Sequence, residues 1–143
     1  MKKELHIRMA VGQGQINKLV QQKNKEIGLL PGQAKILEYI NDYDGCSQND
    51  LCDAWDLDKS TVSGIVMRMV RDGLIVIKAS KLDHRRKVIH LTNLGKEKWE
   101  QIAVYIHAID VAAFSGIPFD QQEAFFTTLE KMYSNLSDNI SIS

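Results

Sequence analysis

The 143-residue sequence is poor in the features that mark secreted and membrane proteins. It has only two cysteines, Cys46 and Cys52, which are too few for a disulfide framework and fit a reducing compartment. No uncharged apolar run approaches the ~20 residues that cross a bilayer. The chain starts with basic residues, as a signal peptide does, but His6 and Arg8 interrupt the apolar segment that should follow. We therefore expect a cytoplasmic protein.

Catalytic and metal-binding patterns are also missing. A Gly-x-Gly pair at Gly12 and Gly14 follows no predicted strand, so it does not indicate a phosphate loop. We find no nucleophile elbow and no paired carboxylates in a catalytic setting. The four histidines are scattered, without a His-x-x-x-His or Cys-x-x-Cys pair. We expect no enzymatic activity, no cofactor and no metal site.

The charge is balanced overall but unevenly placed. A net charge of zero alone argues against a nucleic-acid partner, because nucleic-acid-binding proteins are usually basic. Residues 56–90, however, carry eight basic and four acidic side chains, a net charge of +4, which the rest of the chain compensates. A basic centre of this kind is compatible with one face that meets a polyanion.

Hydrophobic periodicity and breaker residues predict a mostly helical chain. We expect helices over residues 3–27, 31–40, 47–55, 59–72, 93–115 and 119–136, and strands over 74–77 and 88–91. Pro31 is expected at a first helical position, and Ser47 and Asp50 form a capping box. Asp58 caps the next helix and Gly73 ends it. The predicted fold class is α+β, mostly α with a small β-hairpin wing: a winged helix-turn-helix with N- and C-terminal dimerisation helices.

The predicted helix 59–72 has two different faces. Its core face is Val62, Ile65, Val66, Met69 and Val70. Its outer face offers the candidate DNA-binding residues Lys59, Ser60, Thr61, Ser63, Met67, Arg68 and Arg71. Small hydroxylated residues at a helix N-terminus suit insertion into a major groove, where they reach base edges and phosphates. The alternative is an ordinary first turn beside a solvated basic face.

The polar stretch 78–87 between the two predicted strands is a basic loop. It adds Lys81, His84, Arg85 and Arg86 to the candidate DNA-binding residues, since an arginine on a two-stranded wing can enter a minor groove. We expect Asp83 to stabilise the wing by pairing with one of the two arginines and aiming the other. The alternative is a solvated hairpin tip.

The terminal helices carry apolar stripes too wide for the small central unit to cover. A second copy of the chain would bury them, so we expect a homodimer. The candidate interface residues are Leu5, Ile106, Ile109, Phe125, Leu129, Met132 and Leu136. We expect a DNA-binding lobe over residues 30–92, a dimerisation lobe over 1–29 and 93–137, and a frayed tail over 138–143.

Several of these motifs together resemble the MarR (multiple antibiotic resistance regulator) family. They are Asp83-x-Arg85-Arg86 followed by Leu91-Thr92-x-x-Gly95, and, before them, Ser60-Thr61-Val62-Ser63 and Gly73-Leu74-Ile75. The resemblance extends over essentially the whole chain. It implies a dimer that binds double-stranded DNA at a pseudo-palindromic operator, usually as a repressor of adjacent genes, often released by a small aromatic or lipophilic effector. Where the family commonly has an arginine after Gly-Leu-Ile-x, this sequence has Ile77.

The sensing side of such a regulator is less visible in the sequence. An effector cleft is expected where the first, second and fifth helices meet, with His6, Met9, Tyr39 and Trp99 as lining residues, although core packing explains an apolar residue there equally well. The reactive cysteine of the peroxide-sensing branch and the histidine pair of the zinc-sensing branch are missing, since Val111 stands four residues after His107. We expect Cys52 to be buried and Cys46 to lie in a turn, exposed to solvent.

A winged-helix module that binds protein and not DNA is the alternative function. Such modules usually replace the wing arginines and the small polar residues of the recognition helix, and this sequence keeps both.

Overall fold

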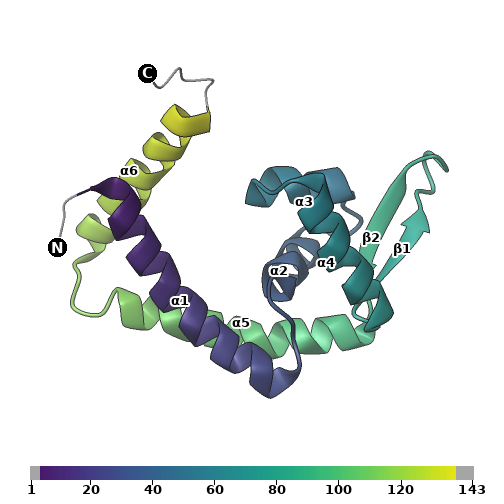
Figure 1. Ribbon diagram of the computed structural model, residues 1–143, viewed down its shortest axis with the longest axis horizontal. Coiled ribbons are helices and arrows are strands. Elements are labelled where there is room, and N and C mark those ends of the chain that lie inside the picture. The colour runs from purple at the N-terminus through teal and green to yellow at the C-terminus, as the bar shows by residue number, and fades with distance from the viewer. Residues whose placement is uncertain (1–3, 138–143) are drawn as a thin grey trace. The chain divides into compact units, whose positions relative to one another are not determined.

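The computed structural model describes residues 4–137, so the predicted frayed tail at 138–143 lies outside the described residues. The described chain forms six helices and one antiparallel hairpin (Figure 1). The elements are α1 (Leu5–Ile27), α2 (Gln33–Asp42), α3 (Gln48–Trp55), α4 (Lys59–Arg71), β1 (Ile75–Ala79), β2 (Lys87–Leu91), α5 (Asn93–Ala113) and α6 (Phe119–Ser137). The predicted fold class is confirmed. No helix among the described residues is long and apolar enough to span a membrane.

The contacts divide the chain into two units, Met1–His107 and Ala108–Ser143. The boundary falls inside α5, and each unit is described by itself. The predicted lobes, which separate DNA binding from dimerisation, are a functional division and stay a prediction.

The first unit is built around one hydrophobic core. The α2 face that carries Ala34, Leu37 and Ile40 is buried, as its helical spacing predicted. It meets Leu51 of α3, Ile89 of β2 and Ile102 of α5 in the same cluster. On α4, Val62, Ile65, Val66 and Met69 join this core, and each fully buried side chain of this size stabilises the fold by about 1.5–3 kcal/mol. The core therefore holds the helix-turn-helix against the base of the hairpin.

Local capping sets the boundaries of α3 and α4. The predicted capping box is present: the Asp50 N–H donates to Ser47 Oγ at 3.1 Å, and the Ser47 N–H donates to Asp50 Oδ2 at 2.8 Å. Asp58 caps α4 by accepting from the Thr61 N–H at 2.7 Å. Asp56, between the two helices, has a φ of 49°, the left-handed conformation that lets the chain turn within three residues. These local interactions begin α4 directly after the turn.

The structure corrects three predictions about these elements. Pro31 does not occupy the first helical position, because α2 begins at Gln33 after Gly32, whose φ of 85° terminates the preceding turn. Val70 is 43% exposed, so the core face of α4 ends at Met69. The hairpin strands extend further into the basic stretch than predicted, because Ala79 pairs with Lys87.

The hairpin and α5 meet at a tightly packed corner. Thr92 caps α5, since the Gly95 N–H donates to its hydroxyl at 3.0 Å. A Cβ atom at Gly95 would lie 2.1 Å from the carbonyl oxygen of Leu74, which no side chain can accommodate without movement. The Gly95 of the family-like motif is thus required by close backbone approach between α5 and the chain before β1.

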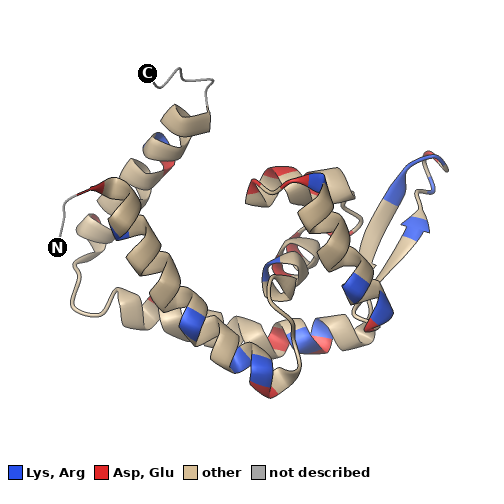
Figure 2. Cartoon of the chain, in the orientation of Figure 1, with Lys and Arg blue, Asp and Glu red and all other residues tan. Residues whose placement is uncertain are grey.

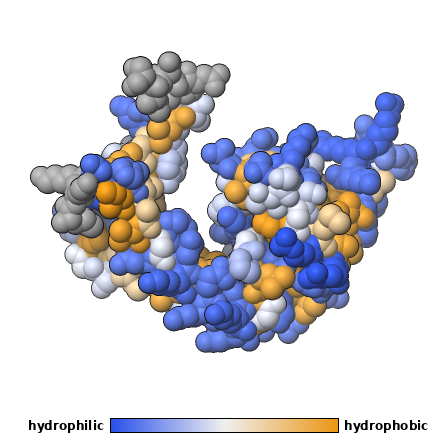
Figure 3. Space-filling model, in the orientation of Figure 1, coloured by the Kyte–Doolittle hydropathy of each residue, from blue (hydrophilic) through white to orange (hydrophobic). Residues whose placement is uncertain are grey.

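α1 joins this unit at its C-terminal end. The Lys98 ammonium group of α5 donates to the Ile27 carbonyl, one of the unpaired carbonyls at the end of α1. Lys23 lies over the ring of Tyr105, 5.8 Å from its centroid. Apolar side chains of the first turns, including Leu5 and Met9, are exposed, and Figure 3 shows hydrophobic surface there.

The second unit contains the end of α5 and all of α6. Phe114, Phe125 and Phe126 form an aromatic cluster with ring centroids 5.3–6.3 Å apart. Phe125, Phe126, Tyr133 and Leu136 are nevertheless about half exposed. A large part of the apolar surface of α6 is therefore uncovered in the single chain.

Candidate nucleic-acid interface

The N-terminal turn of α4 presents small polar groups to solvent. Lys59, Ser60 and Thr61 are exposed, and Ser63 is half-buried. The Thr61 N–H and, at 2.8 Å, the Ser60 hydroxyl both donate to Asp58 Oδ1. These two hydrogen bonds hold the pKa of the Asp58 carboxyl below its usual value. The helix start is thus kept rigid, and its outward side is lined by groups that can hydrogen-bond without bulk.

The next turns of α4 carry long side chains on the exposed face. Met67 is 69% exposed, and it lines a shallow surface hollow with Gly64, Arg68 and Arg71. The Arg71 Nε donates to Asp72 Oδ1 at 3.1 Å, which directs this guanidinium along the helix end. Beyond its first turn, the exposed face of α4 therefore presents two arginines, Arg68 and Arg71, beside the apolar side chain of Met67.

The wing is a folded turn with both arginines at its end. The Ser80 N–H donates to the Arg86 carbonyl at 2.7 Å, and the Arg86 N–H donates to the Asp83 carbonyl at 2.9 Å. The Asp83 carboxylate accepts from the Arg85 N–H at 3.0 Å, so its closest contact is with the backbone of the loop. The Arg85 Nε lies farther away, 4.0 Å from the same oxygen, with its side chain 98% exposed.

The second wing arginine has a partner outside the wing. Arg86 Nη2 lies 3.8 Å from Asp50 Oδ2 on α3. Sequence reasoning identified Asp50 only as a capping residue and missed this pair. The two residues are 36 positions apart, and no local pattern joins them.

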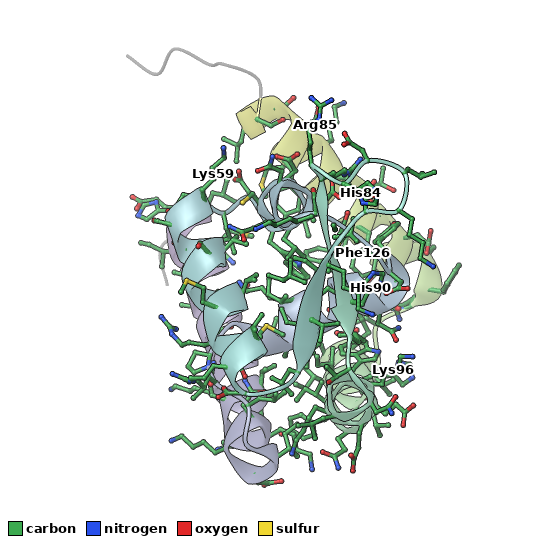
Figure 4. All side chains as sticks on the ribbon, turned by 90° about the vertical axis from the view of Figure 1, so that its right-hand side faces the viewer. Lys59, His84, Arg85, His90, Lys96 and Phe126 are labelled. Atoms are coloured by element: carbon green, nitrogen blue, oxygen red, sulfur yellow. The ribbon has the colours of Figure 1, made fainter. Side chains whose placement is uncertain are left out.

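The hairpin and the C-terminal half of α4 carry more basic than acidic side chains. Figure 2 shows Lys and Arg along the hairpin and at the end of α4, whereas acidic residues are concentrated on α3 and its neighbouring turns. Figure 4 shows Lys59 at the start of α4, and Arg85 with His84 at the end of the hairpin, all in the upper part of the view. Lys81 is exposed in the same loop. The basic side chains thus gather on the wing and in the C-terminal half of α4, whereas at the start of α4 Lys59 follows the acidic residues Asp56 and Asp58.

The predicted effector-cleft residues lie in two settings. Tyr39 and Trp99 are half-buried and both pack against the hydrophobic core, and Tyr39 also stacks on Tyr43 with centroids 4.7 Å apart. His6 and Met9 are exposed on the first turns of α1, where His6 Nε2 lies 3.7 Å from Glu4. In the single chain these four side chains belong to a core edge and a helix surface.

The predicted dimer residues also differ in exposure. Leu5, Phe125 and Leu136 are about half exposed. Leu129 and Met132 are partly buried on α6, and Ile106 is partly buried against the core. Ile109 is 9% exposed within the single chain, so little of it is left for a partner.

The two cysteines differ in burial from what was predicted. Cys46, predicted to be exposed, is buried because its backbone bridges to Ile89 of β2. Burial, with a smaller effect of the Asp50 carboxylate, raises the pKa of its thiol to about 11. Cys52, predicted to be buried, is half-buried. Within residues 4–137 no three His, Cys, Asp or Glu side chains are grouped to hold a metal ion.

Comparison with known proteins agrees with this geometry. The family model described as "MarR family" matches residues 27–86, which span α2 to the wing. A candidate transcriptional regulatory protein for the hcr operon of Thauera aromatica is 35% identical over 111 residues, 78% of this chain and 67% of that protein.

Two solved structures have the same fold over nearly the whole chain. The S. aureus MepR–DNA complex superposes with a TM-score of 0.83 at 25% identity, covering 95% of this chain and 97% of MepR. Bordetella bronchiseptica BpsR, whose structure concerns regulation of DNA binding by 6-hydroxynicotinic acid, superposes with a TM-score of 0.80 at 22% identity over 92% of this chain and 94% of BpsR.

A winged helix-turn-helix with a basic wing beside an exposed recognition helix is the architecture of a DNA-binding transcription regulator. The chain belongs to the MarR family. It is therefore a DNA-binding transcription regulator and not an enzyme.

Proposed function

We propose that the chain acts as a homodimeric repressor that binds a pseudo-palindromic operator. The observation that carries this proposal is that the N-terminal turn of α4 and the wing are both exposed, with basic side chains along the wing and at the end of α4. In this arrangement α4 enters a major groove, where Ser60, Thr61 and Ser63 meet bases and phosphates, and Arg68 and Arg71 reach the backbone. Arg85 extends from the wing to the adjacent minor groove.

Dimerisation is supported by the uncovered apolar surface of the terminal helices. Leu5 on α1 and Phe125 and Leu136 on α6 are large apolar side chains that the single chain leaves about half exposed. Exposed apolar residues on helices outside the DNA-binding core are typical of a subunit interface. A two-fold axis through this interface would place two copies of α4 about one DNA turn apart.

Release by a small molecule is the regulatory part of the proposal. It is supported by the resemblance to a family in which effectors are common and by the similarity to BpsR, whose DNA binding is regulated by 6-hydroxynicotinic acid. The predicted lining residues Tyr39 and Trp99 already lie at the edge of the core, and His6 and Met9 remain accessible on α1.

Selection of binding sites from a random duplex pool tests the proposal. We expect enrichment of an inverted repeat whose half-site centres are about 10 bp apart, because two-fold symmetry of the protein is mirrored in the site. Enrichment of a single asymmetric half-site would contradict the dimer, and no enrichment would contradict sequence-specific binding. A reporter driven by a promoter carrying the selected site should be less active when the protein is present.

The effector is tested with the same duplex. A panel of small aromatic carboxylates that includes 6-hydroxynicotinic acid is titrated into the preformed complex. Dissociation by a member of the panel, at concentrations that leave the protein folded, supports release by a ligand. Unchanged affinity across aromatic and lipophilic compounds would contradict it.

A further inference from the structure

The two adjacent wing arginines have different surroundings. The Arg85 side chain is 98% exposed, and the nearest acidic group belongs to its own loop. The Arg86 side chain is 60% exposed and directs Nη2 toward Asp50 on α3, 3.8 Å away. The Arg85 guanidinium is therefore almost fully exposed beside its own loop, and the Arg86 guanidinium faces the helix-turn-helix.

Asp50 is a well-fixed anchor for this contact. Its carboxylate accepts from the Ser47 N–H at 2.8 Å, and its own N–H donates to Ser47 Oγ at 3.1 Å, so both ends of the residue are held by the capping box. The hydrogen bonds to Ser47, with a smaller effect of Arg86, hold the pKa of the Asp50 carboxyl below its usual value. The carboxylate is consequently ionised and oriented before Arg86 meets it.

Arg86 is equally well fixed within the wing. Its N–H donates to Asp83 and its carbonyl accepts from Ser80, so its backbone closes the turn. The buried residues of the hairpin, such as Ile75 and Ile89, lie nearer its base, and residues 81–87 are all exposed. A two-stranded ribbon has little rigidity of its own beyond its packed part. The pair between Arg86 and Asp50 thus joins the outer wing to the start of α3.

We propose that Asp50 is a positioning residue for DNA binding, which holds Arg86 against α3 and thereby fixes the direction in which the wing presents Arg85. The proposal rests on the DNA-binding function given above. It divides the arginines by role: Arg85 contacts DNA, and Arg86 braces the wing. An exposed ion pair contributes little to stability, so its effect falls on DNA affinity through the geometry of the wing.

The salt dependence of binding separates the two roles. Each phosphate contact that is lost reduces the slope of log affinity against log salt by about 0.9. On the duplex selected from a random pool, Arg85→Gln should reduce this slope. Arg86→Gln and Asp50→Asn should each weaken binding severalfold with the slope unchanged. The double variant should bind no more weakly than the weaker single variant, because both substitutions break the same brace.

The sign of the Asp50→Asn effect is diagnostic. Asparagine can still accept from the Ser47 N–H, but it removes a negative charge near DNA, which by electrostatics alone would tighten binding. Asp53→Asn makes the same charge change on the exposed side of α3 and should bind as tightly as wild type or tighter. Asp50→Glu keeps a carboxylate and should restore near-wild-type affinity. Ser47→Ala damages the cap, keeps the carboxylate, and should lower thermal stability more than affinity.

Two outcomes would overturn the proposal. One is wild-type or tighter binding by Asp50→Asn. The other is a salt slope for Arg86→Gln that is smaller than the wild-type slope by about 0.9, the value of one phosphate contact, which would make Arg86 a direct contact. Failure of the DNA-binding function itself is distinguishable, because then the wild-type protein would bind no duplex at any salt concentration.

Discussion

The hydroxyl group of Thr92 donates a hydrogen bond to the carbonyl oxygen of Gly73 across 2.6 Å. The Thr92 N–H also donates to the Leu74 carbonyl at 3.1 Å. Thr92 therefore connects the end of the recognition helix to the start of α5 through three successive bonds, counting its cap to Gly95. This corner is where the chain that follows α4 is attached to α5, the helix that leads to the second unit.

Gly95→Ala should destabilise the protein, because its Cβ would lie 2.1 Å from the Leu74 carbonyl oxygen. Overpacking of this kind costs about 1–3 kcal/mol of unfolding free energy, measurable by thermal or urea denaturation. Gly12→Ala is the matched control, since nothing lies within 4 Å of the added methyl group and alanine favours a helix. Equal stability of Gly95→Ala and wild type would contradict the close packing.

Arg85→Ala should weaken binding to the selected duplex about tenfold or more while leaving the dimer intact, because the Arg85 side chain is 98% exposed at the wing and we place it on DNA. Leu82→Ala, at a fully exposed position in the same loop, removes side-chain volume without removing charge and should have little effect. Electrophoretic mobility shift measures both variants. Wild-type affinity of Arg85→Ala would refute the placement of the wing on DNA.

Leu136→Glu should dissociate the dimer, because it puts a charge on the apolar face of α6 that we assign to the subunit interface. Leu82→Glu makes the same substitution at the wing and should leave the oligomeric state unchanged. Sedimentation velocity reports the result directly. If Leu136→Glu sediments as the wild type does, α6 is not the interface.

The Asp58 cap should contribute to the pH dependence of stability. Hydrogen bonds from Thr61 and Ser60 lower the pKa of its carboxyl in the folded state, so the stabilisation is present above the unfolded-state pKa and is lost as pH falls through the folded-state value. Urea midpoints measured from pH 6 to pH 3 should fall less steeply for Asp58→Asn, which keeps a capping oxygen without the titration. If the urea midpoints of the variant and the wild type fall equally between pH 6 and pH 3, Asp58 does not contribute to the pH dependence.

Cys46 should react slowly with iodoacetamide in the native protein, because its thiol is buried and its pKa is raised to about 11. The Cys52→Ser variant leaves Cys46 as the single thiol of the 143-residue sequence, so mass spectrometry can follow it alone. Labelling at pH 8 should accelerate strongly in denaturant. Rapid labelling of the folded variant would reopen a redox role.

The elements that sequence analysis predicted best are those held by local interactions. The Ser47–Asp50 capping box and the Asp58 cap join residues three positions apart, so they are visible in the sequence. The exposure of Cys46 could not be read in this way, because its burial depends on a bridge to Ile89, 43 residues away. Helical periodicity placed Val70 on the core face of α4, but it could not show whether another element covers that position. In the structure Val70 is exposed.

The candidate site follows the same division. The outward residues of α4 were predictable because helical spacing assigns its two faces, and the wing was predictable from two β-branched runs around a basic stretch. The pair between Asp50 and Arg86 depends on how the wing lies over α3, which only the tertiary structure provides.

The most direct test of the central claim is the affinity of the wild-type protein for the selected duplex, measured across a salt series. Since the proposed interface contains basic groups from α4 and the wing, log affinity should fall linearly with log salt. The slope should correspond to several phosphate contacts, at about 0.9 for each contact. A flat salt response, or binding no tighter than to random duplex, would contradict the account of this chain as a sequence-specific DNA-binding regulator.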